Sequence, residues 1–113
     1  MMWQLTQEQL DLQARARALA TEVVGPRAAD VDRTESYPGE NVEALRDAGM
    51  TGMTVPTDLG GPGHSLLDAV LVVEEMAKQC GVTGRIAVEA NMGAISAILA
   101  YGTDSQRRLA ADL

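Results

Sequence analysis

Apolar side chains recur at helical spacing from the start of the chain. The first run follows Thr6-Gln7-Glu8-Gln9, which has the form of a capping box with Thr6 as the N-cap. We expect Gly25-Pro26 to end this helix, because proline cannot continue the hydrogen-bond ladder. The polar stretch Arg27–Ser36 has room for about one or two helical turns. The apolar positions of the first helix are Leu5, Leu12, Ala16, Leu19 and Val23.

A second helix is predicted between Pro38 and Gly49. Proline suits the first turn, and glycine suits the position after the last turn because it adopts the left-handed backbone without strain. The following residues, 50–65, are rich in glycine and proline and predict an irregular loop. The apolar face of this helix is Val42, Leu45 and Ala48.

Three more helices are predicted in the second half. Leu66–Gln79 has Ser65 as its N-cap and is apolar on almost every side, which is typical of a helix at the centre of a bundle. Gly81 then breaks the chain. Gly84–Tyr101 is expected to form one long helix, and Asp104–Leu113 a last helix that opens with a second capping box. The apolar face of the long helix is Val88, Met92, Ile95 and Leu99.

These elements together predict an all-α protein. The run Val70–Val73 also fits a buried strand, but the flanking Glu74-Glu75-Met76-Ala77-Lys78 has high helix propensity. We therefore expect an up-and-down-like bundle of about five helices with no strand. The length of 113 residues is that of one domain.

Composition narrows the classes of function. The formal net charge is -7, and neither a nucleic-acid footprint nor docking on an anionic membrane fits that balance. The apolar run Ala69–Val73 is far short of the roughly 20 residues that cross a bilayer. Cys80 is the only cysteine, which excludes an intrachain disulfide, and the start of the chain has no signal-peptide pattern. We expect a cytoplasmic protein.

A series of short motifs occurs along nearly the whole chain in an order that resembles the N-terminal domain of the acyl-CoA dehydrogenase family. Each motif alone is weak, and the order and spacing carry the resemblance. The motifs are Leu5-Thr6-x-Glu8-Gln9, Pro26-Arg27-Ala28, Tyr37-Pro38, Leu45-x-x-Ala48-Gly49, Gly52-x-x-x-Pro56, Gly60-Gly61-x-Gly63, Glu74-Glu75-x-Ala77 and Tyr101-Gly102-Thr103-x-x-Gln106.

The resemblance implies that residues 1–113 are one helical domain of a longer flavoenzyme. Members of the family continue into a β-domain and a C-terminal helical domain, which hold most of the FAD contacts and the catalytic base. We expect both domains to be absent from this chain, which is then inactive alone and has no catalytic residue of its own. The resemblance also implies a short acyl-CoA substrate, α,β-dehydrogenation, and a homotetramer.

A finer set of residues is similar to one branch of that family, the 3-sulfinopropanoyl-CoA desulfinases. This branch keeps the fold and FAD but releases sulfite. Dehydrogenase and desulfinase therefore stay open as alternatives, beside a non-catalytic helical interaction module. The residues are Tyr37-Pro38-x-x-Asn41-Val42, Leu45-Arg46-Asp47-Ala48-Gly49, Glu74-Glu75-Met76-Ala77-Lys78-x-Cys80 and Gly84-Arg85-Ile86.

Arg85 is the main candidate for substrate binding. A guanidinium binds a carboxylate or sulfinate through two hydrogen bonds, and an arginine near the start of an apolar helix suggests a partner anion. In family members that act on acyl groups with an anionic end, an arginine of this kind reaches the acyl pocket. The alternatives are an intrahelical pair with Glu89 or a solvated helix end. Glu89 and Ser96 share a helical face with Arg85 and are weaker candidates, for which a solvent-facing stripe is the simpler interpretation.

Other chemically suggestive residues are expected to be structural. Gly60-Gly61-Pro62-Gly63 lacks the lysine of a phosphate-binding loop and follows no strand, so it is expected to be a tight loop that borders the substrate pocket. His64 and Cys80 are too few for a structural zinc site, and no metal is expected. Glu74 and Glu75 point about 100° apart on a helix and do not form a facing pair.

Overall fold

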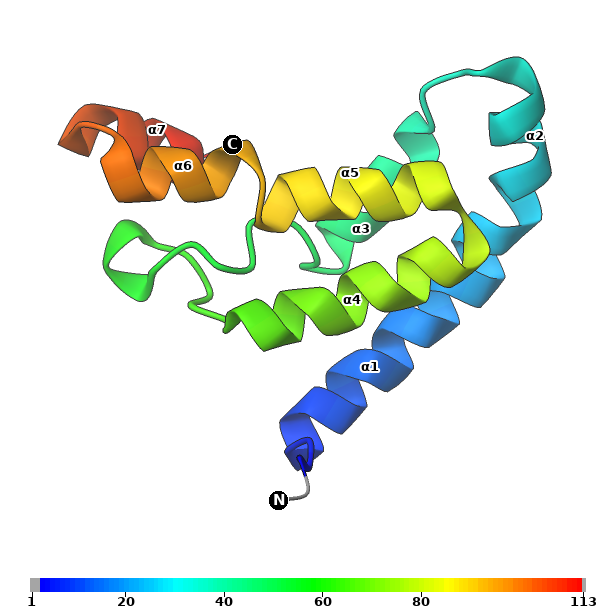
Figure 1. The fold of residues 1–113 in the computed structure, drawn as a ribbon, viewed down its shortest axis with the longest axis horizontal. Helices are drawn as coiled ribbons and strands as arrows, with labels where there is room; N and C mark the ends of the chain where they lie inside the picture. Colours follow the sequence, from blue (N-terminus) through cyan, green and yellow to red (C-terminus); the bar gives the residue numbers. More distant parts are fainter. Residues whose placement is uncertain (1–2, 113) are drawn as a thin grey trace.

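The computed structural model describes residues 3–112, within which every regular element is helical and no strand is present. This confirms the all-α class. Figure 1 shows α4 and α5 side by side, with α1 packed against α4 and the α6–α7 pair beyond the end of α5. The elements are α1 Gln7–Leu19, η1 Ala20–Val24, η2 Gly25–Arg27, α2 Ala28–Thr34, α3 Gly39–Asp47, η3 Thr57–Leu59, α4 Leu66–Gln79, α5 Gly81–Asn91, α6 Ala94–Tyr101 and α7 Asp104–Asp112.

The predicted caps are present. Thr6 and Gln9 form a capping box at α1, and the loop residue Ser65 forms one with Asp68 at α4. Gly49 follows α3 with a φ of 71°, in the left-handed region that glycine tolerates. None of the helices within residues 3–112 has the length and apolar content that crossing a bilayer requires.

The prediction that Gly25-Pro26 ends the first helix is wrong. After α1 the backbone widens into the π-helical turn η1, tightens into the 3-10 turn η2, and continues as α2. The N–H of Gly25 donates to the carbonyl of Ala20, and the N–H of Ala28 donates to that of Gly25. Because Pro26 lies in the first turn of η2, its missing N–H leaves no gap in the ladder.

The core lies between α1, α4 and α5, as expected for a central third helix. Val72 and Met76 of α4 are fully buried and pack with Leu12 and Ala16 of α1. The first two turns of α4 nevertheless leave Leu66, Leu67 and Val70 exposed. Met50 and Met53 of the loop after α3 are also fully buried, while Met92 at the end of α5 is half-buried.

The predicted long helix Gly84–Tyr101 is instead two helices. The first, α5, begins at Gly81 and ends at the buried Asn91, whose side-chain amide binds a loop. Its Nδ2 donates to the carbonyls of Met50 and Ala87 at 2.9 and 3.0 Å, and its Oδ1 accepts from the N–H of Met53 at 2.9 Å. The chain turns at Gly93 before α6 begins.

A buried carboxylate joins α1 to α4. Glu75 is only 3% exposed and accepts from Arg17 at 3.1 Å and from Lys78 at 3.0 Å. Its neighbour Glu74 is 54% exposed, so the two do not form a facing pair, as predicted. The hydrogen bond from Arg17 is the largest cause that holds the pKa of Glu75 below its ordinary value, although burial opposes it.

Replacement of Gly84 tests the close approach of α4 and α5. A Cβ on Gly84 would lie 2.7 Å from both the Cα and the Cβ of Ala77, whereas one on Gly81 would meet nothing within 4 Å. We expect Gly84→Ala to lower the free energy of unfolding by about 1–3 kcal/mol. In the matched control Gly81→Ala it stays unchanged or rises by up to about 1 kcal/mol. Denaturant unfolding measures both, and equal effects would contradict this packing.

The ion pair at Glu75 gives stability a defined pH dependence. Because the folded-state pKa is lowered, its contribution is complete above the unfolded pKa and is lost as the pH falls through the folded pKa. We expect Glu75→Gln to lower the free energy of unfolding by about 1 kcal/mol at pH 7. It should also flatten the acid limb between about pH 5 and 3. Thermal unfolding against pH measures this, with the exposed Glu74→Gln as control. An unchanged acid limb would argue against the pair.

Candidate functional site

The candidate residue Arg85 lies on the outward face of α5. The opposite face of this helix is buried and carries Thr83, Gly84, Ala87 and Asn91. The hydroxyl of Thr83 accepts from the buried Asn41 amide at 3.1 Å, which fixes α5 against α3. Arg85 therefore projects from a helix whose rotation is set by close packing and buried hydrogen bonds.

Arg85 and Glu89 form an ion pair along α5. One carboxylate oxygen, Oε1, lies 2.9 Å from Nε and 2.6 Å from Nη2 of Arg85. The side chains are 75% and 47% exposed. The intrahelical pair that the sequence left open is thus formed, and the guanidinium is not buried. Its role in binding stays a prediction.

Ser96 does not share a face with this pair. The turn at Met92-Gly93 separates α5 from α6, so the spacing of eleven residues no longer returns to the same side of one helix. Ser96 is exposed on α6. The structure therefore brings Arg85 and Glu89 together and leaves Ser96 apart. Substrate binding by Ser96 stays a prediction.

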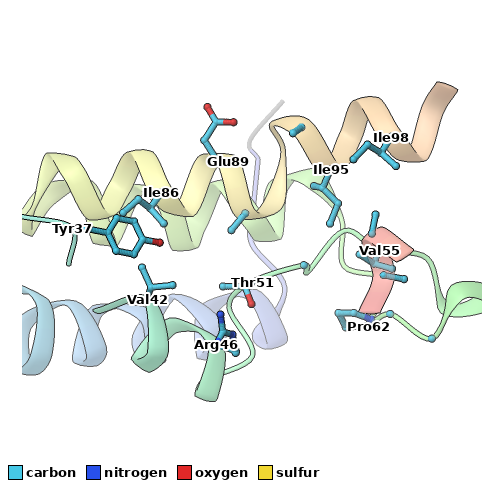
Figure 2. A pocket seen from close by; sticks show the side chains of 17 residues that line it. Tyr37, Val42, Arg46, Thr51, Val55, Pro62, Ile86, Glu89, Ile95 and Ile98 are labelled. Carbon is cyan, nitrogen blue, oxygen red and sulfur yellow. The ribbon is translucent and has the colours of Figure 1, made fainter. Parts of the chain in front are cut away.

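An open groove of about 540 Å³ lies between α5 and α3, and Figure 2 shows the Glu89 side chain pointing away from it. Glu89 is among the lining residues, whereas Arg85 is not. Figure 2 shows the ring of Tyr37 between Ile86 of α5 and Val42 of α3. The loop bearing Gly60, Gly61 and Pro62 forms one wall, as expected for a loop that borders a pocket. The lining residues are Tyr37, Val42, Arg46, Thr51, Gly52, Val55, Gly60, Gly61, Pro62, Ile86, Glu89, Ala90, Ala94, Ile95, Ile98, Ala110 and Ala111.

The shape of that wall depends on Gly61. A Cβ at this position would overlap the side chain and carbonyl of Val55, which is itself buried. The loop is also tied to α5, because the hydroxyl of Thr54 donates to the carbonyl of Asn91 at 2.6 Å. The groove wall is therefore set by two close contacts within the chain.

Sequence reasoning missed Arg46 as a groove residue. It rises from α3 beside Thr51 in Figure 2 and brings a cation to an otherwise mostly apolar lining. The available signal was its place four residues after Val42, which puts both side chains on one helical face. Asn91 was missed as well, because its partners Met50 and Met53 are distant in sequence.

The remaining polar candidates are structural. His64 lies 3.3 Å from Asp68, which also accepts a hydrogen bond from Gln9 of α1 at 2.9 Å. Burial acts to raise the pKa of Asp68, but the hydrogen bonds from Gln9, Ser65 and His64 outweigh it and lower that pKa. Cys80 is buried, and residues 3–112 contain no group of histidine, cysteine and acidic side chains suited to a metal ion.

Comparison with known proteins places these features in a family. The family model described as acyl-CoA dehydrogenase, N-terminal domain, matches residues 6–110. The chain is 63% identical over 112 residues to a 3-sulfinopropanoyl-CoA desulfinase of Variovorax paradoxus, which covers 99% of this chain and 28% of that protein. It is 54% identical over 112 residues to the desulfinase of Paraburkholderia xenovorans, covering 99% of this chain and 29% of that protein.

A more distant relative is named for a different activity. The short-chain specific acyl-CoA dehydrogenase of Clostridium acetobutylicum is 36% identical over 108 residues, which is 96% of this chain and 28% of that protein. The chain therefore spans less than a third of the length of the relatives it matches. It belongs to the acyl-CoA dehydrogenase family, of which it forms the N-terminal helical domain.

Proposed function

We propose that this chain is the N-terminal domain of an FAD-dependent enzyme of the 3-sulfinopropanoyl-CoA desulfinase type. The observation that carries the proposal is the gap in identity between the two classes of relative. Four desulfinases are 54 to 63% identical to the chain, against 36% for the short-chain acyl-CoA dehydrogenase. The second candidate, α,β-dehydrogenation of a short acyl-CoA, is supported by family membership alone.

The role of this domain in the proposal is to bind the anionic end of the acyl group. Arg85 supplies a planar cation on a rigid helix, and a guanidinium matches the two oxygens of a sulfinate or carboxylate. Its exposure within the chain is consistent with a partner that covers this face of α5. Glu89 is placed beside it, while Ser96 enters the proposal as a more distant contact on α6.

FAD and the reacting groups belong to other segments in this proposal. Within residues 3–112 the glycine-rich loop 60–63 follows no strand, unlike the phosphate-binding loop of a dinucleotide fold. We therefore assign the cofactor mainly to the β-domain and C-terminal helical domain of the family. A homotetramer, an acyl-CoA substrate and a cytoplasmic location complete the proposal by family resemblance.

The reaction itself is tested on the intact polypeptide. With 3-sulfinopropanoyl-CoA as substrate, we expect sulfite to be released, as measured with a thiol-exchange dye calibrated against sulfite. With butanoyl-CoA, we expect little reduction of an artificial electron acceptor. Acceptor reduction with butanoyl-CoA and no sulfite release would favour the dehydrogenase instead.

Replacement of Arg85 tests the binding role. We expect Arg85→Gln in the intact enzyme to lower kcat/KM for 3-sulfinopropanoyl-CoA by about 100-fold, because the charged hydrogen bonds to the tail are lost. The matched control is Arg33→Gln, since Arg33 also pairs with an acid on an exposed helix face, Asp30 at 3.0 Å. The two variants should have equal unfolding temperatures. An unchanged kcat/KM in folded Arg85→Gln would remove the proposed role.

A further inference from the structure

One edge of the Arg85 guanidinium is already occupied. A single oxygen of Glu89, Oε1, accepts a hydrogen bond from Nε and lies 2.6 Å from Nη2 in an ion pair. These two nitrogens form the lateral edge of the guanidinium. The end-on edge, made by Nη1 and the second hydrogen of Nη2, has no hydrogen-bond partner among the residues the structure describes. The pair thus leaves a two-donor edge available to a ligand.

Glycine at position 93 leaves open the space that the Glu89 carboxylate occupies. A Cβ on Gly93 would overlap Oε2 of Glu89, so this oxygen lies close to the glycine. Oε1 faces Arg85 on the other side. The hydrogen bond from Nε to Oε1 aligns the carboxylate with the guanidinium.

We infer that Glu89 is a positioning residue, which orients Arg85 so that its end-on edge binds a two-oxygen anion at the end of the acyl group. This inference rests on the proposed function, because it names how Arg85 selects its substrate. Glu89 acts through its hydrogen bonds and not through its charge, since its negative charge opposes the approach of any anion. The hydrogen-bond role and the charge role therefore predict opposite effects of replacement.

Two acyl-CoA probes separate these roles. Succinyl-CoA and butanoyl-CoA have the same number of acyl carbons and differ in a terminal carboxylate. The readout is the ratio of their dissociation constants, butanoyl-CoA over succinyl-CoA, measured by calorimetry on the intact flavoprotein. A purely structural defect weakens both ligands equally and leaves this ratio unchanged.

The expected order of the ratio follows from the geometry. Glu89→Gln keeps an oxygen that accepts from Nε and removes the opposing charge, so the ratio stays equal to that of the wild type or rises. Glu89→Ala removes the acceptor, and the ratio falls about tenfold because the guanidinium loses its orientation. Gly93→Ala, which displaces the carboxylate while both charges remain, lowers the ratio in the same direction.

Each other outcome overturns the inference. A ratio that rises in Glu89→Ala means that Glu89 only repels anions. An equal fall in Glu89→Gln and Glu89→Ala means that the ionic attraction between Glu89 and Arg85, and not the hydrogen-bond acceptor, orients the guanidinium. An unchanged ratio in both variants leaves Glu89 with no role in selection. If Arg85→Gln itself leaves the ratio unchanged, the proposed function fails, and that result is separate from any obtained at Glu89. Circular dichroism confirms that each variant is folded.

Discussion

The close packing of α4 against α5 is the constraint on which the rest of the structure depends. Gly84 meets the backbone of Ala77 with no room for a side chain, so α5 has one allowed rotation about its axis. Successive residues on a helix point about 100° apart. Arg85, the next residue, is therefore turned away from the core, and Glu89 follows one turn later on the same side. The placement of the candidate binding pair is a consequence of a glycine contact on the opposite face.

A second level of organisation comes from buried polar groups. The amide of Asn91 satisfies three backbone groups at once, two of them in the loop after α3. These hydrogen bonds tie the loop after α3 to the end of α5, just before the turn at Gly93. The buried Glu75 likewise joins two helices, because it pairs with Arg17 and so links α4 to α1. Unpaired, each of these groups would be costly to bury, so each one specifies a single arrangement of its neighbours.

The number and order of the main helices could largely be predicted from the sequence. The breaks within them and the contacts between them could not. The capping boxes and the left-handed Gly49 follow from local patterns, because their partners lie within one or two turns. The break at Asn91 could not be predicted, since it depends on partners about 40 residues away. For the candidate site, the pairing of Arg85 with Glu89 was among the alternatives that spacing allows. Spacing does not tell which edge of the guanidinium Glu89 occupies. It also does not tell that Arg46 enters the groove, because both features depend on how the helices pack.

The π-helical turn before Pro26 has a consequence for how this domain can diverge. In a regular α-helix the ring of Pro26 would collide with the carbonyl of Glu22, whereas the wider turn displaces that carbonyl from the path. The extra residue held by the turn and the proline are thus mutually dependent. Deleting one residue from Ala20–Val24 while keeping the proline would kink the helix, and α2 would swing out of line with α1. Homologous chains are expected to gain or lose the two features as a unit, so that insertion length and proline covary at this point.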